Sequence, residues 1–232
     1  MRKLYKFLPA HWASVAIKDQ KLKISLLGTL NDPWELMAVK SSDVTAKSGW
    51  KKVVNMISQS RGVICFSKGW ENPVHWSHYA DLHRGIALGF EVIEKDAVGT
   101  DITVDVEYRD ELVPLPEDLF PFLEPTPHKT AFIQSAIATK YTGWSYEDEV
   151  RYFARLDEPD ESNGHFFADF GNELVLKEVI FGLRYDRHEE MTAILARLRS
   201  VPGIDCWKAA LGIDSFHMIK DPNWTYFQGS NP

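Results

Sequence analysis

Cysteine is scarce in this sequence of 232 residues, which contains only Cys65 and Cys206. The two do not stand in a spacing typical of metal sites, and Cys65 lies in an apolar run that predicts a buried, small hydrophobic side chain. A disulfide-stabilised scaffold is therefore not expected. Sparse, unpaired cysteine is typical of a reducing compartment, so we expect a cytoplasmic protein.

Long hydrophobic runs and excess positive charge are also missing. No apolar stretch approaches the roughly 18 residues of a transmembrane helix, and the first residues lack the apolar segment of a signal peptide. We therefore expect no membrane partner. The net charge is −7, and a protein that binds nucleic acid regardless of sequence normally carries a basic stripe, so this kind of partner is not expected either.

The common motifs of phosphate binding and nucleophilic catalysis are absent. The chain contains neither Gly-x-Gly-x-x-Gly nor Gly-x-x-x-x-Gly-Lys-Ser/Thr, which argues against a P-loop ATPase, a kinase or a Rossmann dehydrogenase. It also lacks the Gly-x-Ser-x-Gly elbow of many hydrolases, and neither cysteine has an evident histidine partner in the sequence.

The composition is that of an ordinary globular protein, with 44% hydrophobic and 25% charged residues. The length suits one large domain, which we expect over residues 1–228, followed by a frayed C-terminus at 229–232. Eight tryptophans and thirteen phenylalanines predict either an aromatic core or an aromatic ligand pocket.

Apolar runs and period-two alternation predict strands, and helical spacing predicts helices between them. The expected strands cover residues 4–8, 21–26, 63–67, 85–91, 102–108, 147–153, 174–181, 204–208 and 215–220. The expected helices cover residues 11–18, 41–60, 74–80, 129–140 and 186–200, with Gly49 as a candidate break and Asp186 as a candidate N-cap. Without a regular βαβ rhythm, this pattern predicts a single compact α+β domain with mixed or antiparallel β-sheets, a split sheet being one alternative, and peripheral helices.

Residues 143–153 combine acids, aromatics and an arginine before a β-prone run. In a strand, Glu147, Glu149 and Arg151 share one face at intervals of about 6.5–7 Å. The guanidinium of Arg151 then keeps the Glu149 carboxylate ionised, whereas Glu147 crowds it. Both a structural ion pair at a sheet edge and a catalytic carboxylate fit this pattern.

A second polar feature is the corner at residues 30–35. Asn31 and Asp32 tolerate turn geometry, and Pro33 holds Asp32 in an extended conformation. Such a rigid corner either caps a helix or grips a ligand.

Histidines gather at His75, His78 and His83, close to Asp81. These are metal-ligand residue types, but the zinc-binding helix places its histidines four residues apart around a glutamate, and this segment does not. We therefore expect no metal and assign no role to the three histidines.

Seven blocks of sequence resemble, in order, a large bacterial family catalogued as a domain of unknown function. The blocks are LYKF (4–7), NDPWE (31–35), VICFS (63–67), WSHYA (76–80), HRGIALGF (83–90), WSYEDEVR (144–151) and EVIFG (178–182). The resemblance spans nearly the whole chain and implies an architecture but no activity.

A second, fold-level resemblance is to ADP-ribosyltransferase-like proteins, in which early strands carry a basic and a hydroxyl or aromatic residue and a late strand carries a glutamate. Lys6, Ser25 and Glu149 occupy comparable places, although Lys6 replaces the usual histidine or arginine. The resemblance implies that Glu149 stabilises the charge that develops as nicotinamide leaves NAD, with Arg151 as its orienting partner. The substrate-binding residues implied with it are Asn31, Asp32, Trp76, Tyr79, Trp144 and Glu147.

Three hypotheses follow. The first is an ADP-ribosyltransferase-like enzyme or NAD glycohydrolase that uses NAD, as a toxin or phage-defence effector. The second is a non-catalytic domain that binds a small ligand, a nucleotide or a partner protein in an aromatic pocket. The third is a metal-dependent hydrolase built on the histidine cluster.

Overall fold

The computed structural model describes residues 1–93, 102–119, 126–171 and 173–224 of the chain. The fold is α+β, as predicted, because helices alternate irregularly with strands that pair in both directions. The segment 229–232, which we expected to be frayed, lies outside the described residues.

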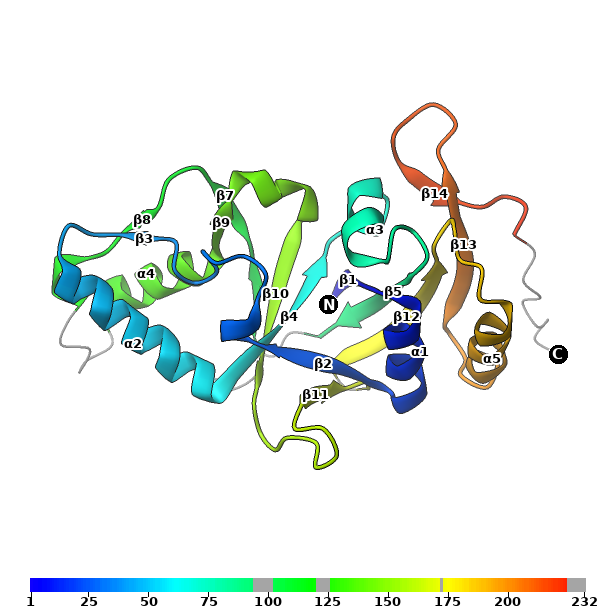
Figure 1. Ribbon diagram of the computed structural model, residues 1–232, viewed down its shortest axis with the longest axis horizontal. Helices are drawn as coiled ribbons and strands as arrows, with labels where there is room; N and C mark the ends of the chain where they lie inside the picture. The colour runs from blue at the N-terminus through cyan, green and yellow to red at the C-terminus, as the bar shows by residue number, and fades with distance from the viewer. Residues whose placement is uncertain (94–101, 120–125, 172, 225–232) are drawn as a thin grey trace. The chain divides into compact units, whose positions relative to one another are not determined.

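Figure 1 shows the helices and strands in chain order. The α-helices are α1 (Ala10–Asp19), α2 (Val44–Ser60), α3 (Pro73–Tyr79), α4 (Pro127–Ala138) and α5 (His188–Leu198). The first strands are β1 (Arg2–Leu8), β2 (Lys21–Leu26), β3 (Val39–Lys40), β4 (Arg61–Ser67), β5 (Ile86–Val92), β6 (Ile102–Asp105) and β7 (Glu107–Arg109). The remaining strands are β8 (Val113–Pro114), β9 (Thr139–Tyr141), β10 (Glu149–Arg155), β11 (Phe166–Asp169), β12 (Leu174–Phe181), β13 (Asp205–Leu211) and β14 (Met218–Lys220).

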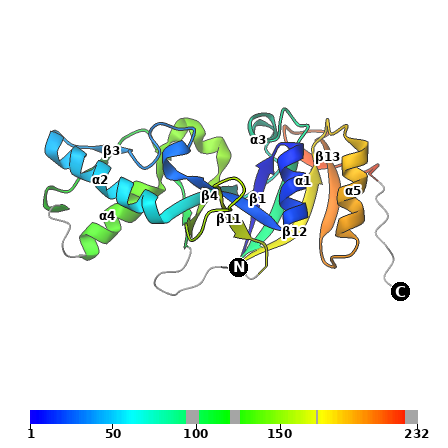
Figure 2. The same ribbon diagram turned by 60° about the horizontal axis from the view of Figure 1, so that its bottom comes forward.

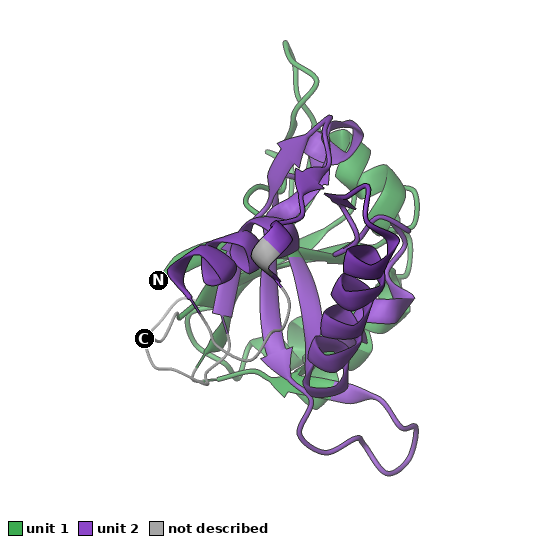
Figure 3. Cartoon of the chain, turned by 90° about the vertical axis from the view of Figure 1, so that its left-hand side faces the viewer, with its two compact units in different colours: residues 1–23, 66–94, 167–232 green, residues 24–65, 95–166 purple. Residues whose placement is uncertain are grey.

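The chain forms two compact units (Figure 3). Unit 1 contains residues 1–23, 66–94 and 167–232, and unit 2 contains residues 24–65 and 95–166. Each unit therefore gathers segments that are far apart in the sequence. One domain over residues 1–228 stays a prediction.

Unit 1 is built on a mixed sheet. Strands β1 and β12 both pair antiparallel with β5, β13 pairs parallel with β12, and β14 pairs antiparallel with β13. One face carries Tyr5 and Phe7, which form a buried cluster with Trp76 of α3 and Trp207 of β13. Helices α1 and α5 pack against each other and cover the other face (Figure 2).

Unit 2 is built on β10, which pairs with both β4 and β6. Helices α2 and α4 meet through Trp50 and Phe132, whose rings contact edge to face at 5.2 Å. Two short parallel ribbons, β3–β8 and β7–β9, complete the unit. The fully buried Trp50 donates its indole N–H to the backbone oxygen of Leu36 at 2.9 Å, so the residue that directly follows the predicted corner at 30–35 is bound to α2.

Local chemistry explains where the helices begin. The Asp43 side chain accepts the N–H of Thr45 at the start of α2, and the Asn72 side chain accepts the N–H of Val74 at the start of α3. A side-chain oxygen at this position satisfies one of the backbone donors that a helix leaves open. Both α3 and α4 also have proline at their first positions, where its missing N–H costs nothing.

Several predicted boundaries were wrong. Helix α2 runs through Gly49 without a break, because buried Trp50 and Val53 hold that part of the helix in the core. Asp186 does not cap α5, which begins after Arg187 without a side-chain cap. The strand expected at 102–108 is two strands with different partners, since β6 pairs with β10 and β7 pairs with β9.

None of the helices in the described part of the chain has both the length and the hydrophobicity that a membrane crossing needs.

Candidate functional site

Strand β10 places Glu149 and Arg151 on one buried face, as period-two alternation predicts. The Arg151 Nε donates to Glu149 Oε1 at 3.4 Å, and each side chain is only 2% exposed. The predicted ion pair is therefore confirmed. Its location is not a sheet edge, because β10 has a neighbouring strand on both sides. We expected Glu147 to belong to this strand, but it is the last residue of the 3-10 helix Thr142–Glu147.

Lys140 joins these acids, and sequence reasoning missed it. Its Nζ lies 2.5 Å from Glu147 Oε2 and 2.7 Å from Glu149 Oε2, with 4% of its side chain exposed. We expected Lys140 at the end of a helix, but α4 stops at Ala138 and residues 139–141 form β9. A three-residue strand directly after a helix gives no recognisable period in the sequence.

Glu35 is the second residue of this cluster that the sequence analysis did not assign to the site. Its carboxylate binds the Arg151 guanidinium and lies 3.9 Å from Lys140 Nζ. The corner at 30–35 positions it: Asp32 Oδ1 accepts the N–H of Trp34 at 2.9 Å, and the Asp32 backbone oxygen accepts the N–H of Glu35 at 3.0 Å. Asp32 is thus a buried turn residue, whereas Asn31 is exposed.

These five side chains form a buried ion network, which we define as Glu35, Lys140, Glu147, Glu149 and Arg151. Three carboxylates face two cations, so the formal charge of the network is −1. Backbone groups hold it in place, because the Glu149 N–H donates to the Tyr108 hydroxyl at 2.8 Å and the Arg151 guanidinium donates to the Ile137 oxygen.

Burial and charge act in opposite directions on this network. Burial raises the pKa of Glu149, but Arg151 and Lys140 together lower it to about 2. Burial also raises the pKa of Glu35, and there the two cations do not fully offset it. Burial lowers the pKa of Lys140, but Glu149, Glu35 and Glu147 raise it above its ordinary value. Glu149 is therefore a firmly ionised carboxylate at neutral pH.

Cys65 has a polar neighbour that its apolar run did not predict. Its side chain packs against the cluster containing Val63 and Phe153. It also hydrogen-bonds to Glu149, which lowers the pKa of that carboxyl. Cys65 is therefore partly buried beside the ion network, and its side chain makes a polar contact as well as apolar ones.

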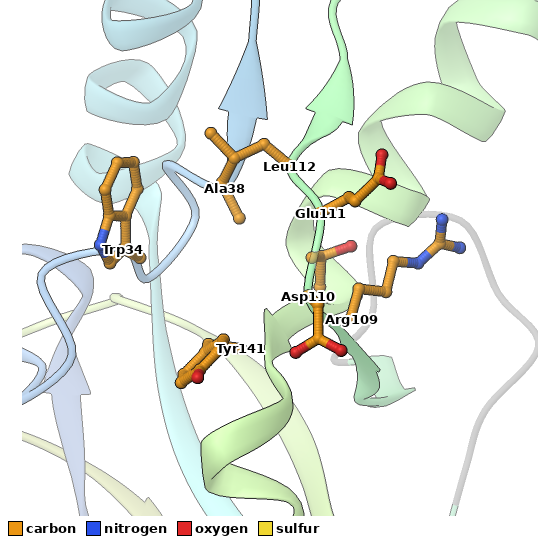
Figure 4. A pocket seen from close by; sticks show the side chains of 8 residues that line it. Trp34, Ala38, Arg109, Asp110, Glu111, Leu112 and Tyr141 are labelled. Carbon is orange, nitrogen blue, oxygen red and sulfur yellow. The ribbon is translucent and has the colours of Figure 1, made fainter.

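A cavity of about 320 Å³ adjoins this network (Figure 4). It is lined by Trp34, Ala38, Arg109, Asp110, Glu111, Leu112, Thr139 and Tyr141. Thr139 and Tyr141 face this cavity, whereas Lys140 between them points to Glu147 and Glu149. Strand β9 is thus the wall between the cavity and the ion network.

The other predicted site residues divide between the two units. Trp144 belongs to unit 2, where the Lys140 Nζ lies 5.3 Å from the centre of its ring. Lys6, Trp76 and Tyr79 belong to unit 1. Trp76 is fully buried and donates its indole N–H to the Trp70 oxygen at 2.6 Å, so a ligand reaches its ring only by displacing core side chains.

Comparison with protein-family models, with curated proteins and with solved structures gave no match. The two resemblances described from the sequence therefore stay predictions. Conclusions about function depend on the geometry of the site itself.

The histidines of the α3 region contact aromatic rings. The His75 ring stacks on Phe7 with centroids 4.7 Å apart, and the His83 ring is nearly parallel to Trp76 at 6.5 Å. Within the described ranges, no group of three or more His, Cys, Asp or Glu side chains is arranged to hold a metal ion. The hydrolase hypothesis thus has no metal site in the described part of the chain.

Proposed function

We propose that unit 2 is a binding module for a small molecule that contains a flat ring, and that the ring is held in the cavity between Trp34 and Tyr141. The observation that carries this proposal is the exposure of these two side chains, 53% for Trp34 and 57% for Tyr141, on the wall of a cavity. Large aromatic side chains left open on a concave surface are typical of ligand sites.

The size of the cavity supports the same function. A volume of about 320 Å³ lies at the lower end of the roughly 300–1,000 Å³ range of ligand pockets. It suits a single ring system with one or two substituents rather than a large cofactor. Trp34 and Tyr141 offer flat faces for stacking.

The ion network restricts the motion of the backbone that forms the wall of this pocket. Glu35 follows Trp34 directly, and Lys140 lies between Thr139 and Tyr141. Fixing Glu35 and Lys140 in buried ion pairs restricts the backbone that carries both aromatic side chains. A preorganised wall loses less conformational entropy when a ligand binds.

Ligand binding to the purified chain tests this function. Adenosine, nicotinamide and NAD are titrated in turn while tryptophan fluorescence is recorded, with wild type, Trp34→Ala and Trp12→Ala. Trp12 is the matched control because it is 60% exposed but lies in α1 of unit 1. We expect a saturable change for at least one ring compound. Loss of one aromatic contact costs about 0.5–1.5 kcal/mol, which weakens binding about two- to tenfold.

Trp12→Ala should bind like wild type. No saturable binding of any of the three compounds, or equal affinity of Trp34→Ala and wild type, would contradict the proposed function.

The second candidate is the NAD-consuming enzyme, as an ADP-ribosyltransferase or NAD glycohydrolase. What favours it is the ionised state of Glu149, because a carboxylate that stabilises the departure of nicotinamide must carry its charge. What places it second is that Arg151 occupies Glu149 Oε1 and Lys140 occupies Oε2. The reaction therefore requires the network to open, and a toxin or phage-defence role depends on that reaction.

Nicotinamide release from NAD tests this second candidate. We compare wild type with Glu149→Gln and with Glu178→Gln, a control at another buried glutamate that accepts from the Tyr5 hydroxyl at 2.9 Å in unit 1. Turnover by wild type and Glu178→Gln, lost only in Glu149→Gln, would support the enzyme. Absence of turnover in all three would exclude NAD as its substrate.

A further inference from the structure

The charged side chains around the cavity are not balanced. The Arg109 guanidinium pairs with the Glu107 carboxylate, and the Lys40 Nζ lies 3.1 Å from Glu111 Oε2. Asp110 also lines the cavity and makes no ion pair with any residue that the structure describes. One carboxylate therefore faces the cavity without a counter-charge from the described residues.

The aromatic walls, like the Asp110 carboxylate, favour a positively charged ligand. The face of an aromatic ring is the negative part of its quadrupole and attracts cations. In Figure 4 the Trp34 and Tyr141 rings lie on one side of the hollow and Asp110 lies across from them. The charged ends of Arg109 and Glu111 point away from the two rings. The groups left to meet a ligand are thus two ring faces and a carboxylate.

The ion network behind β9 does not oppose the binding of a cation in the cavity. Its three carboxylates outnumber its two cations. Burial raises the pKa of Glu35, but even with Glu35 protonated the network has no net positive charge. Its field therefore gives an anion no advantage in the cavity, and the net charge of −7 on the whole chain acts in the same direction.

We propose that the ligand of this cavity is an organic cation, with its charge on or next to a flat ring, held by Trp34, Tyr141 and Asp110. This inference rests on the proposed function and names the chemical class of its ligand. A quaternary or ring-bound nitrogen is weakly hydrated and makes good contact with aromatic faces. A phosphate group finds no such partner here, because the lining guanidinium, Arg109, is paired with Glu107.

A pair of nearly isosteric probes isolates the charge. 1-Methylnicotinamide has a cationic ring, whereas nicotinamide has almost the same shape and is neutral. Both are titrated into the full chain by calorimetry, with wild type, Asp110→Asn and Asp157→Asn. Asp157 is the matched control, because its substitution changes the net charge by the same amount. Asp157 pairs with Arg155, which is the last residue of β10, whereas Glu149 is the first.

We expect wild type to bind 1-methylnicotinamide about tenfold more tightly than nicotinamide. Asp110→Asn should reduce this ratio several-fold, whereas Asp157→Asn should keep it. Urea unfolding midpoints equal to wild type would show that both variants are folded.

The possible failures are distinguishable. If both probes bind wild type equally, or if adenosine binds and neither probe does, the pocket binds rings without a preference for cations. The inference is then overturned while the proposed function stands. If the ratio is unchanged in Asp110→Asn, the carboxylate has no part in it, which also overturns the inference. If no ring compound binds at all, the proposed function fails as well.

Discussion

Replacing Lys140 by methionine tests most severely whether the buried ion network holds unit 2 together. Lys140 Nζ contacts Glu147 at 2.5 Å and Glu149 at 2.7 Å, and its side chain is 4% exposed. Methionine fills a similar volume but removes the charge, which leaves three buried carboxylates facing the single cation Arg151. The formal charge of the network changes from −1 to −2.

The cost follows from burial rather than from attraction alone. Removing one partner of a buried ion pair costs about 3–5 kcal/mol, because an unpaired buried charge remains. Glu147→Gln in the Lys140→Met background removes one of these stranded carboxylates and returns the formal charge to −1. The double variant should therefore be more stable than the sum of the single effects predicts, by about 1–3 kcal/mol.

Urea unfolding at pH 7, followed by tryptophan fluorescence, measures this coupling in a double-mutant cycle. The control cycle uses Lys40→Met and Glu111→Gln. These residues form an ion pair at 3.1 Å in which the Lys40 side chain is 50% exposed and the Glu111 side chain is 84% exposed. Exposed pairs of this kind contribute about 0–1 kcal/mol. A Lys140–Glu147 coupling no larger than the Lys40–Glu111 coupling would refute the argument that the network stabilises unit 2.

Two further predictions concern pH and backbone packing. The pKa of Glu149 falls from an ordinary 4.5 to about 2 in the folded chain, so its charge contributes about 3 kcal/mol of stability above pH 4.5, and this contribution is lost as the pH falls toward 2. Unfolding free energies measured across this range should slope less in Glu149→Gln, and identical slopes would count against the folded-state charge. A Cβ at Gly182 would lie 2.2 Å from the His83 backbone oxygen, whereas one at Gly28 would meet nothing within 4 Å. Gly182→Ala should thus cost about 1–3 kcal/mol in urea unfolding, and a variant no less stable than Gly28→Ala would contradict the packing.

Local chemistry predicted most elements of the fold. The strand expected at 4–8 ends before Pro9, and the helix expected at 74–80 begins at Pro73, where the missing N–H of proline costs nothing. Predictions failed where tertiary contacts outweigh local preference. Gly49 costs a helix about 1 kcal/mol, but the neighbouring Trp50 is completely buried, and that burial maintains α2.

The candidate site was only half predictable. Glu149 and Arg151 are two residues apart on a strand, so alternation alone brings them together. Glu35 lies 116 residues from Arg151 in the sequence, and Lys140 depends on a three-residue strand. No local period connects such positions, because their meeting depends on how the chain folds back. The cavity was missed for the same reason, although the aromatic content of the chain predicted that a pocket of this kind could exist.

Ligands of unit 2 should bind in the Trp34–Tyr141 cavity. The ¹H–¹⁵N spectrum of the tryptophan indole groups, recorded during addition of adenosine, nicotinamide and 1-methylnicotinamide in turn, tests this location of the site. The indole signal of Trp34 should shift in a saturable way, most strongly with 1-methylnicotinamide, while those of Trp12 and Trp50 stay in place. A Trp34 signal that does not move, or a ligand that shifts other indoles and not this one, would contradict it.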